Sequence, residues 1–188
     1  MARILFLALV LVYPLSLSAQ STSEFPTDDD ITTLMQQANL GMEQYQIAMR
    51  DQATRFSDDT ESNQRNKNSA ENWQFLMSLV KTKPENFNSG VGFMVVDQLN
   101  SAYQDALVCE IKSISAAGTA FALKDDGHQS AAMETANACM NAAQLLVIVK
   151  VSATKLYTKN LQAHKVLYER SLRTVTACTE ALKKVVPK

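Results

Sequence analysis

Helix-breaking residues are scarce in this chain. The 188 residues include five glycines and four prolines, and neither type occurs between Gly127 and Pro187. Glycine and proline destabilise helix interiors, whereas the alanine, leucine, glutamine, methionine and lysine that are abundant here favour them. The chain is therefore predicted to be all-helical.

The clearest helical signal is the stretch LMQQANLGMEQYQIAMR, in which methionine recurs every seven residues at Met35, Met42 and Met49. Apolar residues between 31 and 56 alternate in steps of four and three, which is the spacing of a heptad seam. The seam predicts one long amphipathic helix.

Capping residues and polar stretches mark where the first helices begin and end. Thr27, with Asp30 three residues later, has the arrangement of a capping box, which places the first helix at 28–56. Residues 57–71 are polar over nearly their whole length and are predicted to form a flexible loop. The short amphipathic helix that follows carries four apolar residues on one face: Trp73, Leu76, Met77 and Val80.

A third helix is predicted at about 93–123, and the turn KDDGH at 124–128 ends it, with Gly127 as the residue suited to a positive φ. This helix carries two apolar stripes, so neighbours are expected on two of its sides. The second stripe consists of Leu107, Ile111, Ile114, Gly118 and Phe121.

The last 60 residues pose a length problem. As one helix, residues 129–186 would span about 85 Å, which exceeds the size of such a domain. We therefore predict a break near 157–164, with Asn160 as the C-cap.

The start of the chain, MARILFLALVLVYPLSLSAQ, has a basic residue, an apolar run and then small residues. The run is too short to cross a bilayer and ends in a cleavage-like site, so residues 1–18 are predicted to be a signal peptide rather than an uncleaved anchor. Residues 19–27 are expected to be a linker, and 28–188 an antiparallel bundle of four long helices plus one short amphipathic helix. The mature protein is expected to be secreted and extracellular, with no transmembrane segment.

Three cysteines occur, at Cys109, Cys139 and Cys178. In an oxidising compartment two are expected to pair. Residues face each other in a helical hairpin when their midpoint is the turn, and both Cys109–Cys139 and Cys139–Cys178 meet this condition. The first pair is slightly favoured, because its turn is located independently of the cysteines. The third thiol is expected to be buried, since free cysteine packs as a small hydrophobe.

Charge is distributed unevenly along the chain. From Ala19 to Val149 there are 8 basic and 17 acidic residues, whereas from Lys150 onward there are 9 basic and 2 acidic residues. One interpretation is that a basic last helix packs beside acidic helices within one bundle. The other is that a basic face meets anionic lipid head groups or an acidic partner.

Motifs for catalysis and cofactor binding are absent from the sequence. There is no nucleophile elbow, phosphate loop or dinucleotide fingerprint. The two histidines, His128 and His164, lack a second histidine or cysteine at metal-ligand spacing. We therefore expect no enzymatic activity, no cofactor, no metal and no nucleic-acid partner.

The methionine seam carries the functional hypothesis. Methionine is flexible and polarizable, so such a seam either fills an ordinary core or parts to admit a hydrophobic ligand. We predict a secreted bundle that binds a lipid or another hydrophobic small molecule. The alternative is a protein–protein interaction module, such as an inhibitor, a coat component or a seminal-fluid component, with no internal ligand. The candidate ligand-lining residues are Met35, Met42, Tyr45, Met49, Trp73, Met77, Met133 and Met140.

Three cysteine-containing helical segments, ALVCEIKSI, ANACMNAAQLL and TVTACTEALKK, resemble the secreted insect helical proteins of the tsetse EP-like group. The resemblance covers roughly residues 95–185, implies a haemolymph, gut or reproductive-fluid protein with lipid carriage among the suggested roles, and carries over no functional residue. A second resemblance is to the plant invertase and pectin methylesterase inhibitors, which are secreted four-helix bundles. Those inhibitors have an N-terminal cysteine hairpin, and this chain has no cysteine before Cys109.

Overall fold

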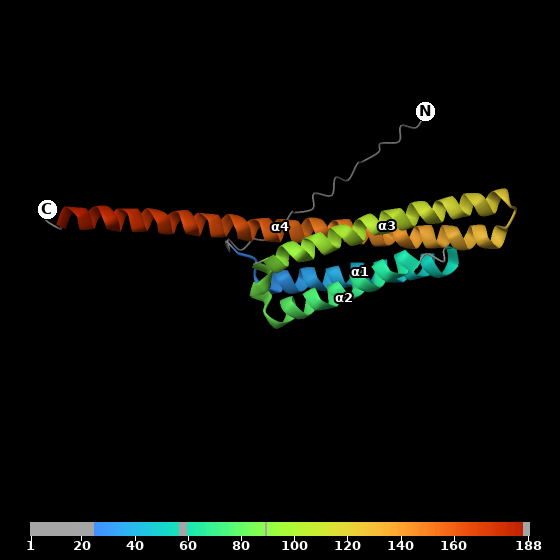
Figure 1. Cartoon of the computed structure of the whole chain (residues 1–188), viewed down its shortest axis with the longest axis horizontal. Helices are drawn as coiled ribbons and strands as arrows, with labels where there is room; N and C mark the ends of the chain where they lie inside the picture. The colour runs from blue at the N-terminus through green and yellow to red at the C-terminus, as the bar shows by residue number, and fades with distance from the viewer. Residues whose placement is uncertain (1–24, 57–59, 89, 186–188) are drawn as a thin grey trace, which may run out of the picture.

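The computed structural model of the chain describes residues 25–56, 60–88 and 90–185, and these ranges are helical apart from short connections (Figure 1). The all-helical prediction is confirmed. The predicted signal peptide, residues 1–18, lies outside the described residues. The elements are α1 (Asp28–Phe56), α2 (Thr60–Thr82), the 3-10 helix η1 (Pro84–Asn88), α3 (Gly90–Ala122) and α4 (Asp126–Val185).

The capping box at the start of α1 is formed as predicted. The Asp30 N–H donates to Thr27 Oγ1 at 3.1 Å, and the Thr27 N–H donates back to Asp30 Oδ2 at 3.0 Å. These hydrogen bonds lower the pKa of the Asp30 carboxyl, because they favour its charged form. The helix begins at Asp28 for this reason.

The core of the bundle lies along one side of α1, which contacts α2, α3, α4 and η1. In the described residues α4 packs on α3 and α1, whereas α2 packs on α1 and α3 and does not reach α4. The heptad seam of α1 consists of positions 31, 35, 38, 42, 45, 49, 52 and 56 and faces this core, and all of these residues except Phe56 are buried. The buried members are Ile31, Met35, Ala38, Met42, Tyr45, Met49 and Gln52.

The predicted flexible loop at 57–71 is wrong for most of its length. Helix α2 begins at Thr60, so residues 60–71 are helical, and the predicted short helix is the second half of a 23-residue one. The polar composition of this segment gives no amphipathic pattern that would indicate a helix. Its contacts with the rest of the bundle are polar: Ser69 is buried, and Asn66 Nδ2 donates to the Gln46 carbonyl of α1 at 3.4 Å. A helix can be polar on most of its surface when only one side of it packs against the rest of the protein.

The turn between α3 and α4 differs in detail from the prediction. Lys124, not Gly127, has the positive φ, at 58°. Gly127 lies inside the first turn of α4, and Asp125 caps this helix by accepting the His128 N–H on Oδ1 at 3.0 Å. Lys124, two residues after the last residue of α3, therefore has the left-handed conformation that terminates this helix.

The predicted break at 157–164 is also wrong, because α4 is one helix of 60 residues. At 1.5 Å per residue it is about 90 Å long, and it projects well beyond the other helices at its C-terminal end (Figure 1). Asn160 is not a C-cap. It is fully buried, and its Nδ2 donates to the Asn88 carbonyl at 2.9 Å, which fastens the end of η1 to α4.

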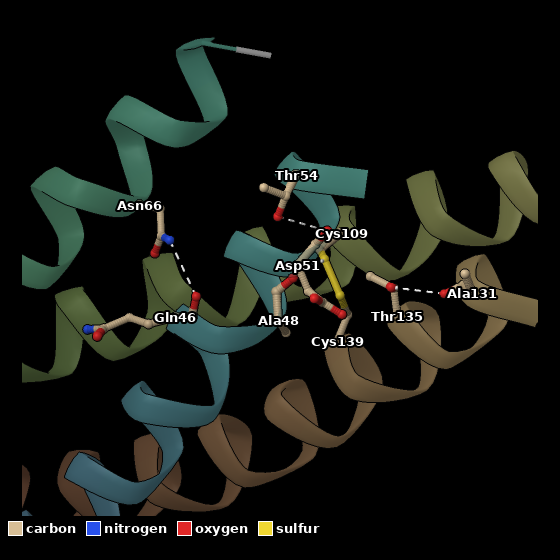
Figure 2. The surroundings of a disulfide bond; sticks show 9 residues. All are labelled: Gln46, Ala48, Asp51, Thr54, Asn66, Cys109, Ala131, Thr135 and Cys139. Carbon is tan, nitrogen blue, oxygen red and sulfur yellow. Dashed lines mark hydrogen bonds between the residues drawn. A yellow bond between two sulfur atoms is a disulfide. The ribbon is translucent and has the colours of Figure 1, made fainter. Parts of the chain in front are cut away.

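The disulfide joins Cys109 of α3 to Cys139 of α4, with the two Cα atoms 5.9 Å apart, as the slightly favoured pairing predicted. Figure 2 shows this bond beside Ala48 and Asp51 of α1. A loop of 30 residues closed in this way stabilises the fold by roughly 3.5 kcal/mol in the chain-entropy account. The expectation for the third thiol is wrong, because Cys178 is free and exposed.

Two further expectations about packing fail. The second apolar stripe of α3 is mostly exposed in the described part of the chain: Leu107 packs against the core, but Ile111 is 67 % exposed and Phe121 is 70 % exposed. The basic end of the chain packs beside the other helices only over its first residues, where Lys150 Nζ donates to Asn100 Oδ1 of α3 at 3.1 Å. Residues 164–181 of α4 are exposed throughout their length.

Two glycines of α3 predict stability changes of opposite sign. A Cβ at Gly92 would collide with the Phe87 carbonyl oxygen, a backbone atom that cannot rotate away, whereas a Cβ at Gly118 meets nothing within 4 Å. We expect Gly92→Ala to lower the free energy of unfolding by about 1–3 kcal/mol. Gly118→Ala is expected to raise it by about 0.5–1 kcal/mol. Urea denaturation of both variants tests this, and equal stability would contradict the close approach of η1 to α3.

Candidate functional site

A groove of about 360 Å³ lies between α1, α2 and the start of η1. Its buried floor is formed by Ile31 and Met35 of α1 and Val80 of α2, with Met77 half-buried beside them. These side chains share one groove because they recur at three- and four-residue spacing on the facing sides of two helices. The rim consists of Thr32, Gln36, Asn39, Lys81 and Pro84.

Hydrogen bonds hold the walls of this groove. The buried Trp73 indole Nε1 donates to Asn39 Oδ1 at 2.9 Å and so ties α2 to α1 at one end of the groove. At the other end, Asn86 Nδ2 donates to the Leu79 carbonyl at 2.9 Å, which fixes the path of the chain from α2 into η1. The groove is therefore shaped by ordered elements rather than by a loop.

The chemistry of the groove combines an apolar floor with one cationic group on the rim. Two flexible methionines let the floor adjust to the shape of an apolar molecule. Lys81, one helical turn after Met77, provides an ammonium group at the edge. Such a site suits a small apolar molecule that has a polar or anionic end.

The predicted ligand-lining residues fall into separate places. Met35 and Met77 line the groove, and Trp73 braces its end. By contrast, Met42 and Tyr45 are fully buried in the core, and Met49 is 7 % exposed beside a recess of only about 20 Å³.

The two predicted residues on α4 lie away from this groove. Met133 is 44 % exposed and Met140 is half-buried, and neither belongs to its lining. Sequence reasoning also missed Lys81, Val80 and Ile31 as groove residues. The available signal was that Val80 and Lys81 follow Met77 by three and four residues on one helix.

Tyr45 anchors a buried polar network in which its hydroxyl donates to Asp105 Oδ2 of α3 at 3.2 Å. Burial first, and then the negative charge of Asp105, raise the pKa of this phenol well above its ordinary value. Ser69 of α2 contributes to the same network and accepts a hydrogen bond from Gln98 Nε2 at 2.8 Å. The network fixes three helices to one another and leaves Tyr45 protonated.

Other hollows of the surface are less suited to a small molecule. One, of about 700 Å³, is lined by α4 residues alone and is the open side of a single helix. Another, of about 560 Å³, lies at the tip of the α3–α4 hairpin around Phe56 and His128, whose rings are 5.6 Å apart. Among the described residues, no group of three His, Cys, Asp or Glu side chains is placed to hold a metal ion.

One described helix, α4 over Asp126–Ala181, is long and apolar enough to cross a membrane by length and composition. A core helix of a bundle passes the same test, and this one packs against α1 and α3. The property is thus a weak indication of a membrane span.

Comparisons with protein-family models, with characterised proteins and with solved structures found no match for this chain.

The raised pKa of Tyr45 predicts a loss of stability at high pH. Above about pH 10 the phenol ionises in the unfolded chain while the folded state keeps its proton, so folding binds more protons and weakens as the pH rises. Tyr45→Phe should cost about 1 kcal/mol at pH 7 and should lose less stability than the wild type between pH 9 and 11. Chemical denaturation across this range measures both. Parallel pH profiles for the two proteins would be the contrary result.

Proposed function

We propose that the protein is a secreted, non-enzymatic, antiparallel helical bundle that binds a small apolar molecule with an anionic end. The groove between α1 and α2 is the binding site in this proposal. The observation that carries it is that Met35 and Met77, from two different helices, line one groove of about 360 Å³.

The size and lining of the groove support this class of ligand. Pockets for small molecules in proteins have volumes of roughly 300–1,000 Å³, mostly apolar walls and a few polar groups that orient the ligand. Here the floor would take the apolar part, and the Lys81 ammonium would face a carboxylate at the rim. A single acyl chain with a free carboxylate fits that description.

The ligand in this proposal does not enter the centre of the bundle. Met42 and Tyr45 lie at zero exposure and are tied into the core. Parting the seam around them would expose a packed interior and break the hydrogen bond from Tyr45 to Asp105. The methionines at the centre are packing residues, and only the end of the seam near η1 binds the ligand.

A second function, protein–protein interaction, is favoured by a different observation. Large apolar side chains are exposed in a cluster in the C-terminal part of α4. This part of the chain is distant in sequence from the groove residues. Such a cluster marks an interaction surface rather than ordinary solvent-facing helix. Its members are Leu161, Leu167, Tyr168, Leu172 and Val175.

Filling the groove should abolish ligand binding. Met77→Trp places a larger ring at the groove wall and is expected to weaken the binding of radiolabelled dodecanoic acid at least tenfold in equilibrium dialysis. Phe75→Trp is the matched control, because Phe75 lies on the same helix but is 59 % exposed away from the groove lining. Absence of dodecanoate binding to the wild type, or equal binding by both variants, would refute the proposed site.

Removing the rim cation should change selectivity rather than stability. Lys81→Gln keeps the length of the side chain but removes its charge, so we expect dodecanoate to bind several-fold more weakly and dodecanol to bind as before. Dialysis with both ligands measures the ratio. Equal losses for the acid and the alcohol would show that Lys81 does not contact the anionic end.

A further inference from the structure

The C-terminal extension, residues 164–185 of α4, leaves the bundle at its first residue, where the His164 ring lies 5.5 Å from the ring of Phe25. The extension is about 33 Å long and projects beyond the other helices (Figure 1). Its described side chains, 164–181, are all exposed. Most helical stability in proteins comes from packing an amphipathic face rather than from intrinsic propensity. The extension therefore has a face that requires a partner.

That face continues the core-facing side of the same helix. Eighteen residues complete about five helical turns, so residues 18 apart point in the same direction. Val175 is in line with Cys139, and Leu167 with Val149, and both Cys139 and Val149 are buried in the bundle. The exposed face consists of His164, Leu167, Tyr168, Ser171, Leu172, Val175 and Cys178.

We propose that this face pairs with the same face of a second copy of the chain, with the two extensions antiparallel. A two-fold axis between Leu172 and Arg173 brings residues 164–181 of each copy into full overlap. An interface of this kind is isologous and closed, so it yields a dimer and no larger polymer.

The direction follows from where the bundle lies. On the N-terminal side of residue 163, the core-facing side of α4 is occupied by α1 and α3. A parallel partner would have to run its own α4 into that end of the bundle. An antiparallel partner approaches from beyond the C-terminus, and its bundle lies past the end of the first copy's extension.

The charged residues of the overlapping segment are compatible with this antiparallel register. Residues 164–181 hold three basic and two acidic side chains, so two copies repel each other little. The axis brings Lys165 level with Glu180 of the partner, and the reciprocal pair forms by symmetry. Lys165 lies about a quarter of a turn from the centre of the exposed face, and Glu180 lies about two-fifths of a turn from it on the same flank.

The ends of the dimer are complementary as well. Lys183 and Lys184, in the last turn of α4, come level with residues 161–162 of the partner. The acidic first turn of α1, Asp28–Asp30, lies near this level, because the ring of Phe25, three residues before it, is 5.5 Å from the ring of His164. The basic end of each chain therefore meets the acidic end of the other chain's bundle.

The first test is the mass of the full mature chain in solution. Sedimentation equilibrium at roughly 50 µM should give a dimer for the wild type. Leu172→Glu should weaken dimerisation at least 100-fold, because it places two carboxylates at the axis. Val166→Glu is the matched control: Val166 is 49 % exposed and Leu172 is 48 % exposed, but Val166 lies on the opposite side of the helix, and this variant should remain a dimer.

The second test is the direction of pairing, in a Cys178→Ser background with a copper–phenanthroline oxidant. Only thiols with Cα atoms within about 7 Å can be bridged. Leu172→Cys, next to the axis, should cross-link as a covalent dimer, whereas Val175→Cys should not. Cross-linking of Val175→Cys as efficiently as Leu172→Cys would indicate parallel helices and overturn the antiparallel arrangement.

The third test is charge exchange. Lys183→Glu with Lys184→Glu should weaken the dimer at least tenfold, and adding Asp28→Lys with Asp29→Lys to the same chain should restore it. A monomeric wild type, or a dimer insensitive to Leu172→Glu, overturns the proposal. If that monomer instead binds phosphatidylserine–phosphatidylcholine vesicles through Leu172, the face serves an anionic membrane and the dimer is excluded.

Discussion

Burial of the apolar seam of α1 is the interaction on which the bundle depends. This helix contacts α2, α3, α4 and η1. Met42 and Tyr45 at its centre are fully buried, so their packing holds three neighbours at once. The heptad spacing of the methionines is thus explained by packing, and their flexibility matters for binding at the end of the seam.

The disulfide and the polar network act on different helices of the same core. Cys109–Cys139 restrains α3 against α4, whereas Tyr45, Ser69 and Asp105 join α1, α2 and α3. The covalent bond reduces the freedom of the unfolded chain, and the network specifies how α2 docks. Helix α2 needs such polar contacts, because its first half offers few apolar side chains.

The sequence was most informative where apolar spacing and caps agree. The seam of α1, its start at Asp28 and its end at Phe56 followed from period and capping, because both signals are local. The proximity of Cys109 to Cys139 followed from the position of one turn. Interactions that lie within one helix or one hairpin could therefore be predicted.

Features that depend on distant partners could not be predicted in the same way. The first half of α2 is a helix because Asn66 and Ser69 dock on other helices, which composition does not reveal. The break near Asn160 was predicted from an assumption about domain size, and α4 violates that assumption by leaving the bundle. Of the candidate site, Met35 and Met77 were identifiable, but Lys81 became relevant only once α1 lay beside it.

The continuity of α4 also has a consequence for the dynamics of the chain. One hydrogen-bonded rod passes from a packed interior into solvent, so the protection of its amides against deuterium exchange should fall along its length, from near-global opening around Leu146 to local fraying beyond His164. Any partner that covers the far end would slow exchange there and leave the rates near Leu146 unchanged. Exchange rates along this one helix therefore measure two opening equilibria. The rates near Leu146 measure the opening of the bundle, and the rates beyond His164 measure the opening of the far end, with or without a partner.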